Sequence, residues 1–215
     1  MPVRSVPGAA SVAAPQDGKL FAPAAARNSE VLCDLLAAVA PAEGHALEIA
    51  SGTGQHVAAY AARLPGLQWQ PTEVDEIRRA SIQAYISESG LRNISPPILL
   101  DATAPGWGKQ HTGQDLIVLV NLLHLISEGE ARTLISEAAA GLAPGGRFVI
   151  YGPFMRGGEL TSDGDRRFHA TLKAHDPATG YKDDFDTIDW LQAAGFELLQ
   201  AVEMPANNLA LVSRK

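Results

Sequence analysis

Two glycines separated by one residue follow an apolar run that contains a single carboxylate. Gly52 and Gly54 come just after Ala46–Ala50, which carries Glu48. A strand that breaks into such a turn and continues as a helix lets the backbone approach a nucleotide-like ligand. A carboxylate inside an apolar run needs partners to offset its desolvation, so Glu48 favours a ligand too. The alternative is an ordinary tight turn with a strand-end carboxylate.

A second carboxylate stands where a ribose would need one. Glu73 lies about 20 residues beyond Gly54, just past an apolar run at residues 67–70. In nucleotide-binding units an acidic residue at this place accepts hydrogen bonds from the ribose hydroxyls. Asp75 is close enough to be the second candidate for that role.

Two residues near expected strand ends are candidates for catalysis. His124 follows the apolar run at residues 115–120 and could take a proton from a nucleophile, or it could be a structural histidine. Tyr151 ends the run at residues 147–151. Together with Phe154 it could wall a substrate pocket, or both rings could pack at the edge of the core.

Other polar residues could reach a substrate. Asn207 and Asn208 lie between the last two apolar runs, where they could also be turn residues that tolerate a left-handed backbone. Arg27, beside Asn28, could clamp an anion or a carboxylate. An exposed arginine before a helix more often has no such role.

The elements that must position these residues alternate between strand and helix. Asn28 or Ser29 can cap the first helix. The periodicity predicts helices over residues 31–39, 57–64, 76–89, 131–142 and 186–194, and strands over 46–50, 67–70, 98–100, 115–120, 147–151, 196–202 and 209–213. Such alternation predicts a parallel sheet with right-handed crossovers. Only residues 203–208 separate the last two strands, so these should pair antiparallel.

The chain should form one domain over residues 21–215, preceded by a flexible tail at residues 1–20. That tail lacks the continuous apolar region of a signal peptide. Residues 154–187 form a long polar stretch without clear periodicity, although residues 165–174 could be a short helix. Loops of this length are usually lids or binding loops, so we expect the stretch to cover the substrate.

Composition narrows the classes of partner. The net charge is −7 and no Lys/Arg-rich run occurs, which disfavours nucleic acid. Cys33 is the single cysteine and no Cys/His cluster has zinc-ligand spacing, so we expect no disulfide and no metal. No apolar stretch approaches the roughly 18 residues of a membrane span. We therefore expect a cytoplasmic protein that binds neither membrane nor nucleic acid.

Two features argue against a dinucleotide. Val57 occupies the position of the third glycine of the dinucleotide fingerprint, and the sheet should end with an antiparallel pair. In both features the chain resembles the class I S-adenosylmethionine-dependent methyltransferases. The first motif of that family reads acidic-x-Gly-x-Gly-x-Gly. Here Glu48-Ile-Ala-Ser-Gly-Thr-Gly54 departs at Ala50, where the first glycine usually stands. Alanine in place of glycine costs little conformational free energy at position 50 if its φ stays negative.

The resemblance covers about residues 28–213 and implies a fold, a cofactor and a site. The fold is α/β, a Rossmann-like, doubly wound, mostly parallel sheet with a C-terminal antiparallel strand pair. Asp101 would face the adenine amino group, and the segment from Asn121 to His124 would line the methionine end. The expected contacts of S-adenosylmethionine are Glu48, Ala50, Ser51, Gly52, Gly54, Glu73, Val74, Asp101, Ala102, Asn121 and Leu122. The expected substrate contacts are Arg27, Asn28, Phe154, Asn207 and Asn208.

A narrower likeness concerns several short motifs. Arg27-Asn28, Trp69–Asp75, Tyr151–Phe154 and Met204–Asn208, with Thr161-Ser162 and Asp176-Pro177, resemble a methyltransferase-like family that includes methyltransferase-like protein twenty-six. This likeness sharpens the expected fold and cofactor, but it names no substrate.

Three hypotheses of function follow. The first is methylation of a small molecule by in-line transfer from S-adenosylmethionine, which needs alignment more than a dedicated catalytic residue. The second is a non-catalytic module that binds the same cofactor, motivated by Ala50 and by the absence of an evident general base. The third is a dehydrogenase-like protein that binds NAD. A homodimer is also open, because an edge strand or the first helix could form its surface.

Overall fold

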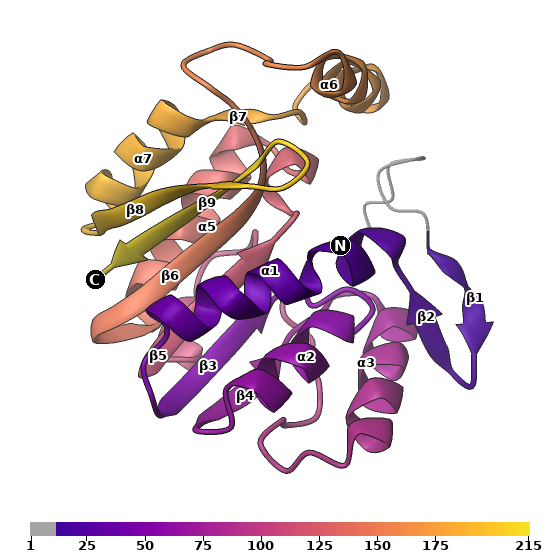
Figure 1. Ribbon diagram of the computed structural model, residues 1–215. Helices are drawn as coiled ribbons and strands as arrows, with labels where there is room; N and C mark the ends of the chain where they lie inside the picture. Colours follow the sequence, from indigo (N-terminus) through magenta and orange to yellow (C-terminus); the bar gives the residue numbers. More distant parts are fainter. Residues whose placement is uncertain (1–11) are drawn as a thin grey trace.

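The computed structural model describes residues 12–215 and is built around one mixed sheet (Figure 1). Its strands are β3 (Gly44–Ile49), β4 (Leu67–Pro71), β5 (Gln114–Val120), β6 (Leu142–Met155), β7 (Lys182–Asp183), β8 (Glu197–Met204) and β9 (Asn208–Arg214). The order is β4-β3-β5-β6-β9-β8, and β7 pairs with β6 off this path. β4, β3, β5 and β6 are parallel neighbours, whereas β9 is antiparallel to both β6 and β8. The predicted fold class is confirmed.

Helices cover both faces of the sheet. They are α1 (Pro23–Val39), α2 (Gln55–Arg63), α3 (Glu76–Ser89), α4 (Trp107–Gln110), α5 (Glu128–Gly141), α6 (Asp163–His175) and α7 (Asp184–Ala193), with a 3₁₀ turn η1 at Leu123–Leu125. Alternate residues of β5 enter different core clusters: Leu116 and Val118 pack with α1, α2 and α3, and Ile117 and Leu119 pack with α4, α5 and α7. Burial on both faces explains why β5 reads as a continuous apolar run.

The first helix begins earlier than the sequence predicted. We expected Asn28 or Ser29 at its cap, but α1 starts at Pro23 and no side chain caps its first turn. Proline is favourable there, since its φ is already helical and the missing N–H would have no partner within the helix. Asn28 instead lies inside α1 with a buried side chain, which frees its amide for the site described below.

The predicted strand at residues 98–100 does not form. Ile98 makes a single parallel bridge to Thr72 beyond the end of β4, and the side chain of Leu99 is 68% exposed. Pro96 and Pro97 precede this segment and have no N–H groups to donate to a ladder. The chain therefore leaves the sheet edge before a strand is established.

The expected N-terminal tail is ordered in part. Residues 1–11 lie outside the described residues. The prediction was wrong for the next segment, where β1 (Ala13–Gln16) and β2 (Lys19–Phe21) form an antiparallel hairpin. Its turn, Asp17-Gly18, has φ values of 53° and 78°, as a two-residue hairpin turn requires. The Ser81 hydroxyl of α3 accepts the Leu20 N–H at 2.8 Å and holds the hairpin beside the sheet.

The long polar stretch contains more structure than a loop. α6 confirms the helix suggested for residues 165–174, and β7 follows it. In Figure 1, α6 stands beyond the sheet, on the same side as the β8–β9 turn. None of the helices within residues 12–215 is long and apolar enough to cross a membrane.

Candidate functional site

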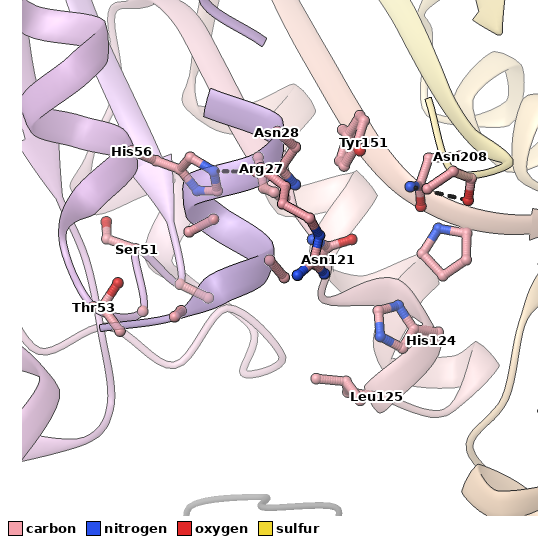
Figure 2. Close-up of a pocket in the computed structure, with 18 of the residues that line it drawn as sticks. Arg27, Asn28, Ser51, Thr53, His56, Asn121, His124, Leu125, Tyr151 and Asn208 are labelled. Atoms are coloured by element: carbon pink, nitrogen blue, oxygen red, sulfur yellow. Dashed lines mark hydrogen bonds between the residues drawn. The ribbon is translucent and has the colours of Figure 1, made fainter. Parts of the chain in front are cut away.

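A cavity of about 730 Å³ opens at the carboxyl ends of β3, β5 and β6. The strand order reverses between β3 and β5, and such a switch point is where open α/β sheets bind ligands. Residues 48–53 form one wall and α1 another, and the loop after β5, the end of β6, α6 and the β8–β9 turn complete it (Figure 2). Its volume is within the range of small-molecule and cofactor sites.

Backbone strain concentrates at this cavity. Ala50 has a φ of 53°, so the condition of a negative φ, under which alanine would cost little, is not met. Asn121, at the end of β5, has a φ of 56°, and both residues line the cavity. A left-handed backbone costs an L-residue about 1–2 kcal/mol. Non-glycine residues held in this region cluster at functional sites, which indicates one here.

Glu48 brings an unsatisfied carboxyl group to the cavity. Its side chain is 2% exposed, and Oε2 finds no hydrogen-bond partner among residues 12–215. Burial raises the pKa of Glu48 to about 8, with the Ser51 hydroxyl opposing this shift and the charge of Glu73 adding to it. The carboxyl group is thus mostly protonated at neutral pH until a cationic partner arrives.

Glu73 supports the glycine turn instead of lining the cavity. One oxygen accepts the Gly52 N–H at 3.0 Å, and the other accepts the Val74 and Asp75 N–H groups. The carboxylate is 3% exposed and is absent from the described lining. The ribose contact of Glu73 stays a prediction. The second candidate, Asp75, caps α3 by accepting from the Ile77 and Arg78 N–H groups.

Asp101 is a turn cap, the alternative to the predicted adenine contact. Its carboxylate accepts the Thr103 N–H at 2.9 Å and the Thr103 hydroxyl at 2.7 Å, and it does not line the described cavity. Of the three carboxylates that we expected to converge, Glu48 alone lines the described cavity, and ligand contacts of Glu73 and Asp101 stay predictions.

The predicted cofactor residues divide into two groups. Those lining the cavity are Glu48, Ala50, Ser51, Gly52 and Asn121. Those outside the described lining are Gly54, Glu73, Val74, Asp101, Ala102 and Leu122. Gly54 has a packing reason for its identity, since an added Cβ would lie 2.7 Å from the Ile82 Cα atom in α3. Ala102 is buried, and Leu122 packs against the core cluster of α5.

Both catalytic candidates line the cavity. His124, in η1, packs edge-on against Phe168 and Tyr181. Burial, with the nearby Lys182 charge, lowers the pKa of His124 to about 3, so its ring is neutral. Burial raises the pKa of Tyr151, opposed by Asn28, the Arg27 charge and Asn208. Tyr151 is therefore a protonated hydroxyl in a polar corner.

The predicted substrate residues also divide. Arg27, Asn28 and Asn208 line the cavity, and Figure 2 shows Arg27 directed into it toward Asn121. Phe154 is 2% exposed within the core cluster of α5 and α7, so its interpretation as a pocket wall was wrong. Asn207 has a φ of 60°, and its amide donates to the Thr161 hydroxyl at 2.6 Å.

Comparison with known proteins identifies a family. A model described as "Protein of unknown function (DUF938)" matches residues 19–215. The chain belongs to this family.

Solved structures share the fold of this DUF938 chain. An O-methyltransferase family protein from Burkholderia thailandensis has 19% identity and a TM-score of 0.76, covering 89% of this chain and 57% of that one. An O-methyltransferase family 2 protein from Planctomyces limnophilus, solved with apigenin, has 19% identity and a TM-score of 0.72, covering 89% and 60%. Human N-acetylserotonin methyltransferase, solved with SAM, has 16% identity and a TM-score of 0.72, covering 89% and 52%. The DUF938 chain thus spans little more than half the length of these proteins.

Sequence reasoning missed several lining residues of this DUF938 chain. His56 donates from Nε2 to the Asn28 amide oxygen at 2.8 Å and fixes that side chain at the cavity. Arg78 lines the cavity near Glu73, with 3.9 Å between the closest nitrogen and oxygen. Phe168 and Tyr181 come from the polar stretch. No motif marked these positions, because tertiary packing of α6 brings them to the site.

Proposed function

We propose that this chain is an S-adenosylmethionine-dependent methyltransferase that acts on a small-molecule acceptor. One observation carries the proposal: the unpartnered, buried carboxyl oxygen of Glu48 lines a cavity beside a strained glycine turn. The class I methyltransferase fold supports it, and the cavity lies at the switch point of that fold.

The charges at the glycine turn fit this cofactor better than a dinucleotide. A pyrophosphate at the turn would lie beside the Glu48 carboxyl group and would suffer repulsion from its ionised form. The amino-acid tail of S-adenosylmethionine instead offers an ammonium group, which is the partner that a buried carboxylate lacks. Ser51, Thr53 and Asn121 add hydrogen-bonding groups along the same wall.

The chain's own contribution to the reaction is alignment and exclusion of water. S-adenosylmethionine supplies an activated methyl group when bound. Holding two reactants in the reactive orientation can lower the activation free energy by roughly 7–11 kcal/mol. Positioning by the cavity walls is therefore sufficient for a reactive acceptor. α6 and the β8–β9 turn contribute Phe168, Pro205 and Asn208 to those walls, and they would cover the acceptor.

Finer aspects of the proposal rest on sequence alone. The likeness to the methyltransferase-like family that includes methyltransferase-like protein twenty-six stays a prediction from its short motifs. A cytoplasmic location and a homodimer also stay predictions. The small-molecule class of acceptor is supported by the neighbour solved with apigenin and by the size of the cavity.

Turnover separates an enzyme from a binding module. The folded protein is incubated with methyl-labelled S-adenosylmethionine and a small-molecule extract. We expect label in at least one extract component, and clearly less of it when Glu48→Gln replaces the wild type. A thermal shift with S-adenosylhomocysteine, but none with NAD, is expected in parallel. Binding without any labelling would favour the non-catalytic module, and a shift with NAD alone would contradict the proposal.

A further inference from the structure

The acceptor side of the cavity has an aromatic wall. Phe168 of α6 and Tyr181 lie with ring centroids 6.0 Å apart at an interplanar angle of 73°, and His124 meets both rings edge-on. The Tyr181 hydroxyl donates to Asp165 at 3.0 Å, which fixes the ring from behind. Rigid edge-on rings favour an aromatic ligand, because offset and edge-to-face contacts between rings are the preferred ones.

The charged residues on the acceptor side of the cavity favour the binding of an anion. Within residues 12–215, Glu48 is the one acidic residue that lines the cavity, and it lies at the glycine turn. Arg27 lines the acceptor side, is exposed, and has no carboxylate within ion-pair distance in the described chain. A guanidinium group binds a carboxylate through two parallel hydrogen bonds. An amine acceptor would find no carboxylate here.

The same side offers no effective base. A general base works best when its pKa is near the operating pH. His124 has a pKa lowered to about 3 by burial, and Tyr151 has a raised pKa, so neither holds a proton-accepting form of useful strength. The nucleophile must therefore arrive with a free lone pair, and the Arg27 charge favours a nucleophile that is an anion.

We propose that the acceptor is an aromatic carboxylic acid, oriented by Arg27 and the Phe168–Tyr181 wall and methylated on its carboxylate oxygen. The inference rests on the proposed function. A carboxylate oxygen forms a bond to the methyl carbon as the carbon–sulfur bond breaks, and sulfur keeps the bonding pair. The products are a methyl ester and S-adenosylhomocysteine, and no proton moves. An anion and a sulfonium cation become two neutral groups, a change that a water-poor cavity favours.

Binding to the product-cofactor complex tests this acceptor. Protein saturated with S-adenosylhomocysteine is titrated with 2-naphthoate and benzoate, and with the isosteric amides 2-naphthamide and benzamide. We expect at least one carboxylate to bind about tenfold more tightly than its amide, and Arg27→Met to remove that preference. Arg63→Met, which removes an exposed arginine paired with Asp34, is the matched control and should keep it.

Each contrary result has a distinct meaning. If S-adenosylhomocysteine binds normally but no carboxylate binds better than its amide, the acceptor class is wrong. If Arg27→Met weakens S-adenosylhomocysteine itself by about tenfold, Arg27 serves the cofactor tail and the acceptor role is overturned. If S-adenosylhomocysteine does not bind the wild type, the proposed function fails and this inference falls with it.

The labelled product gives an independent readout. Methyl esters release their methyl group as volatile methanol in mild alkali, whereas aryl ethers and methylamines do not. Label transferred to an extract should be released by alkali. Label that resists alkali would contradict the proposal while leaving the proposed methyltransferase activity intact.

Discussion

At the scale of single residues, the buried carboxyl group of Glu48 makes the stability of the protein depend on pH. Its pKa rises from an ordinary 4.5 to about 8 on folding, so between these values the folded state binds more protons than the unfolded state. Stability is then fully present below the lower value and falls as pH rises toward the upper one. Below pH 6.5 the buried rings of His56 and His124 oppose this trend, because folding lowers the pKa of each from its ordinary 6.5. We therefore predict a melting temperature that decreases from about pH 6.5 to about pH 8.

The matched variant is Glu48→Gln, which keeps the shape and cannot ionise. The variant should show a flatter pH profile than the wild type and a melting temperature at least as high near pH 8, the upper limit of that window. Scanning calorimetry in buffers across the window measures both. Parallel profiles for the two proteins would show that Glu48 is not the titrating group.

Between elements, Gly54 sets the distance from the glycine turn to α3. It has a φ of 96°, and a Cβ would approach the Ile82 backbone to 2.7 Å. We predict that Gly54→Ala lowers the free energy of unfolding by about 2–4 kcal/mol, because steric overlap adds to backbone strain. Urea unfolding followed by circular dichroism measures the loss.

Gly90→Ala is the control for this effect. Gly90 ends α3 with a φ of 64°, and no atom lies within 4 Å of an added Cβ. Its substitution should cost about 1 kcal/mol from backbone strain alone. Equal losses at the two positions would contradict the steric account of Gly54.

The β8–β9 turn is tied to α6 by one side chain. The Asn207 amide donates to Asp165 in α6 and to the Thr161 hydroxyl. We predict that Asn207→Gly, which retains the left-handed backbone, raises the amide exchange rates of α6 about tenfold. Ala206→Gly, at a neighbouring φ of 57°, is the control and should leave α6 unchanged. Hydrogen–deuterium exchange with mass spectrometry distinguishes them.

The order of elements was predictable from sequence because each buried strand and amphipathic helix carries its own period. The strand at residues 98–100 does not form because Pro96 and Pro97 remove ladder donors, a local effect that overrides the apolar character of the segment. The hairpin at Ala13–Phe21 also had a local signal in Asp17-Gly18. Boundaries such as the start of α1 at Pro23 are less constrained, since packing against the sheet decides them.

The site was less predictable than the fold. Glu48 was found because its placement in an apolar run is itself unusual. The ribose contact of Glu73 stays a prediction, whereas its hydrogen bonds to the backbone of the glycine turn were not foreseen from any motif. Phe168 and Tyr181 reach the cavity only because α6 packs beyond the end of β6, and a contact between such distant segments leaves no period in the sequence.

Across the whole molecule, the cavity joins parts that are far apart in the chain. The glycine turn after β3 carries the buried carboxyl group, α1 carries Arg27, and α6 with the β8–β9 turn supplies the far wall. The reversal of strand order between β3 and β5 creates the opening in which these parts meet. The arrangement places Glu48, which we propose binds the cofactor tail, and Arg27, which we propose binds the acceptor, on two separate walls.

The central claim is that Glu48 binds the ammonium of an amino-acid tail, and a pair of ligands tests it directly. S-adenosylhomocysteine carries the tail, whereas 5′-methylthioadenosine lacks it. Calorimetric titration of the wild type should give about tenfold or greater preference for S-adenosylhomocysteine, and Glu48→Gln should lose most of that preference while binding 5′-methylthioadenosine unchanged. Equal preference in the two proteins, or no binding of either ligand at millimolar concentration, would contradict the account.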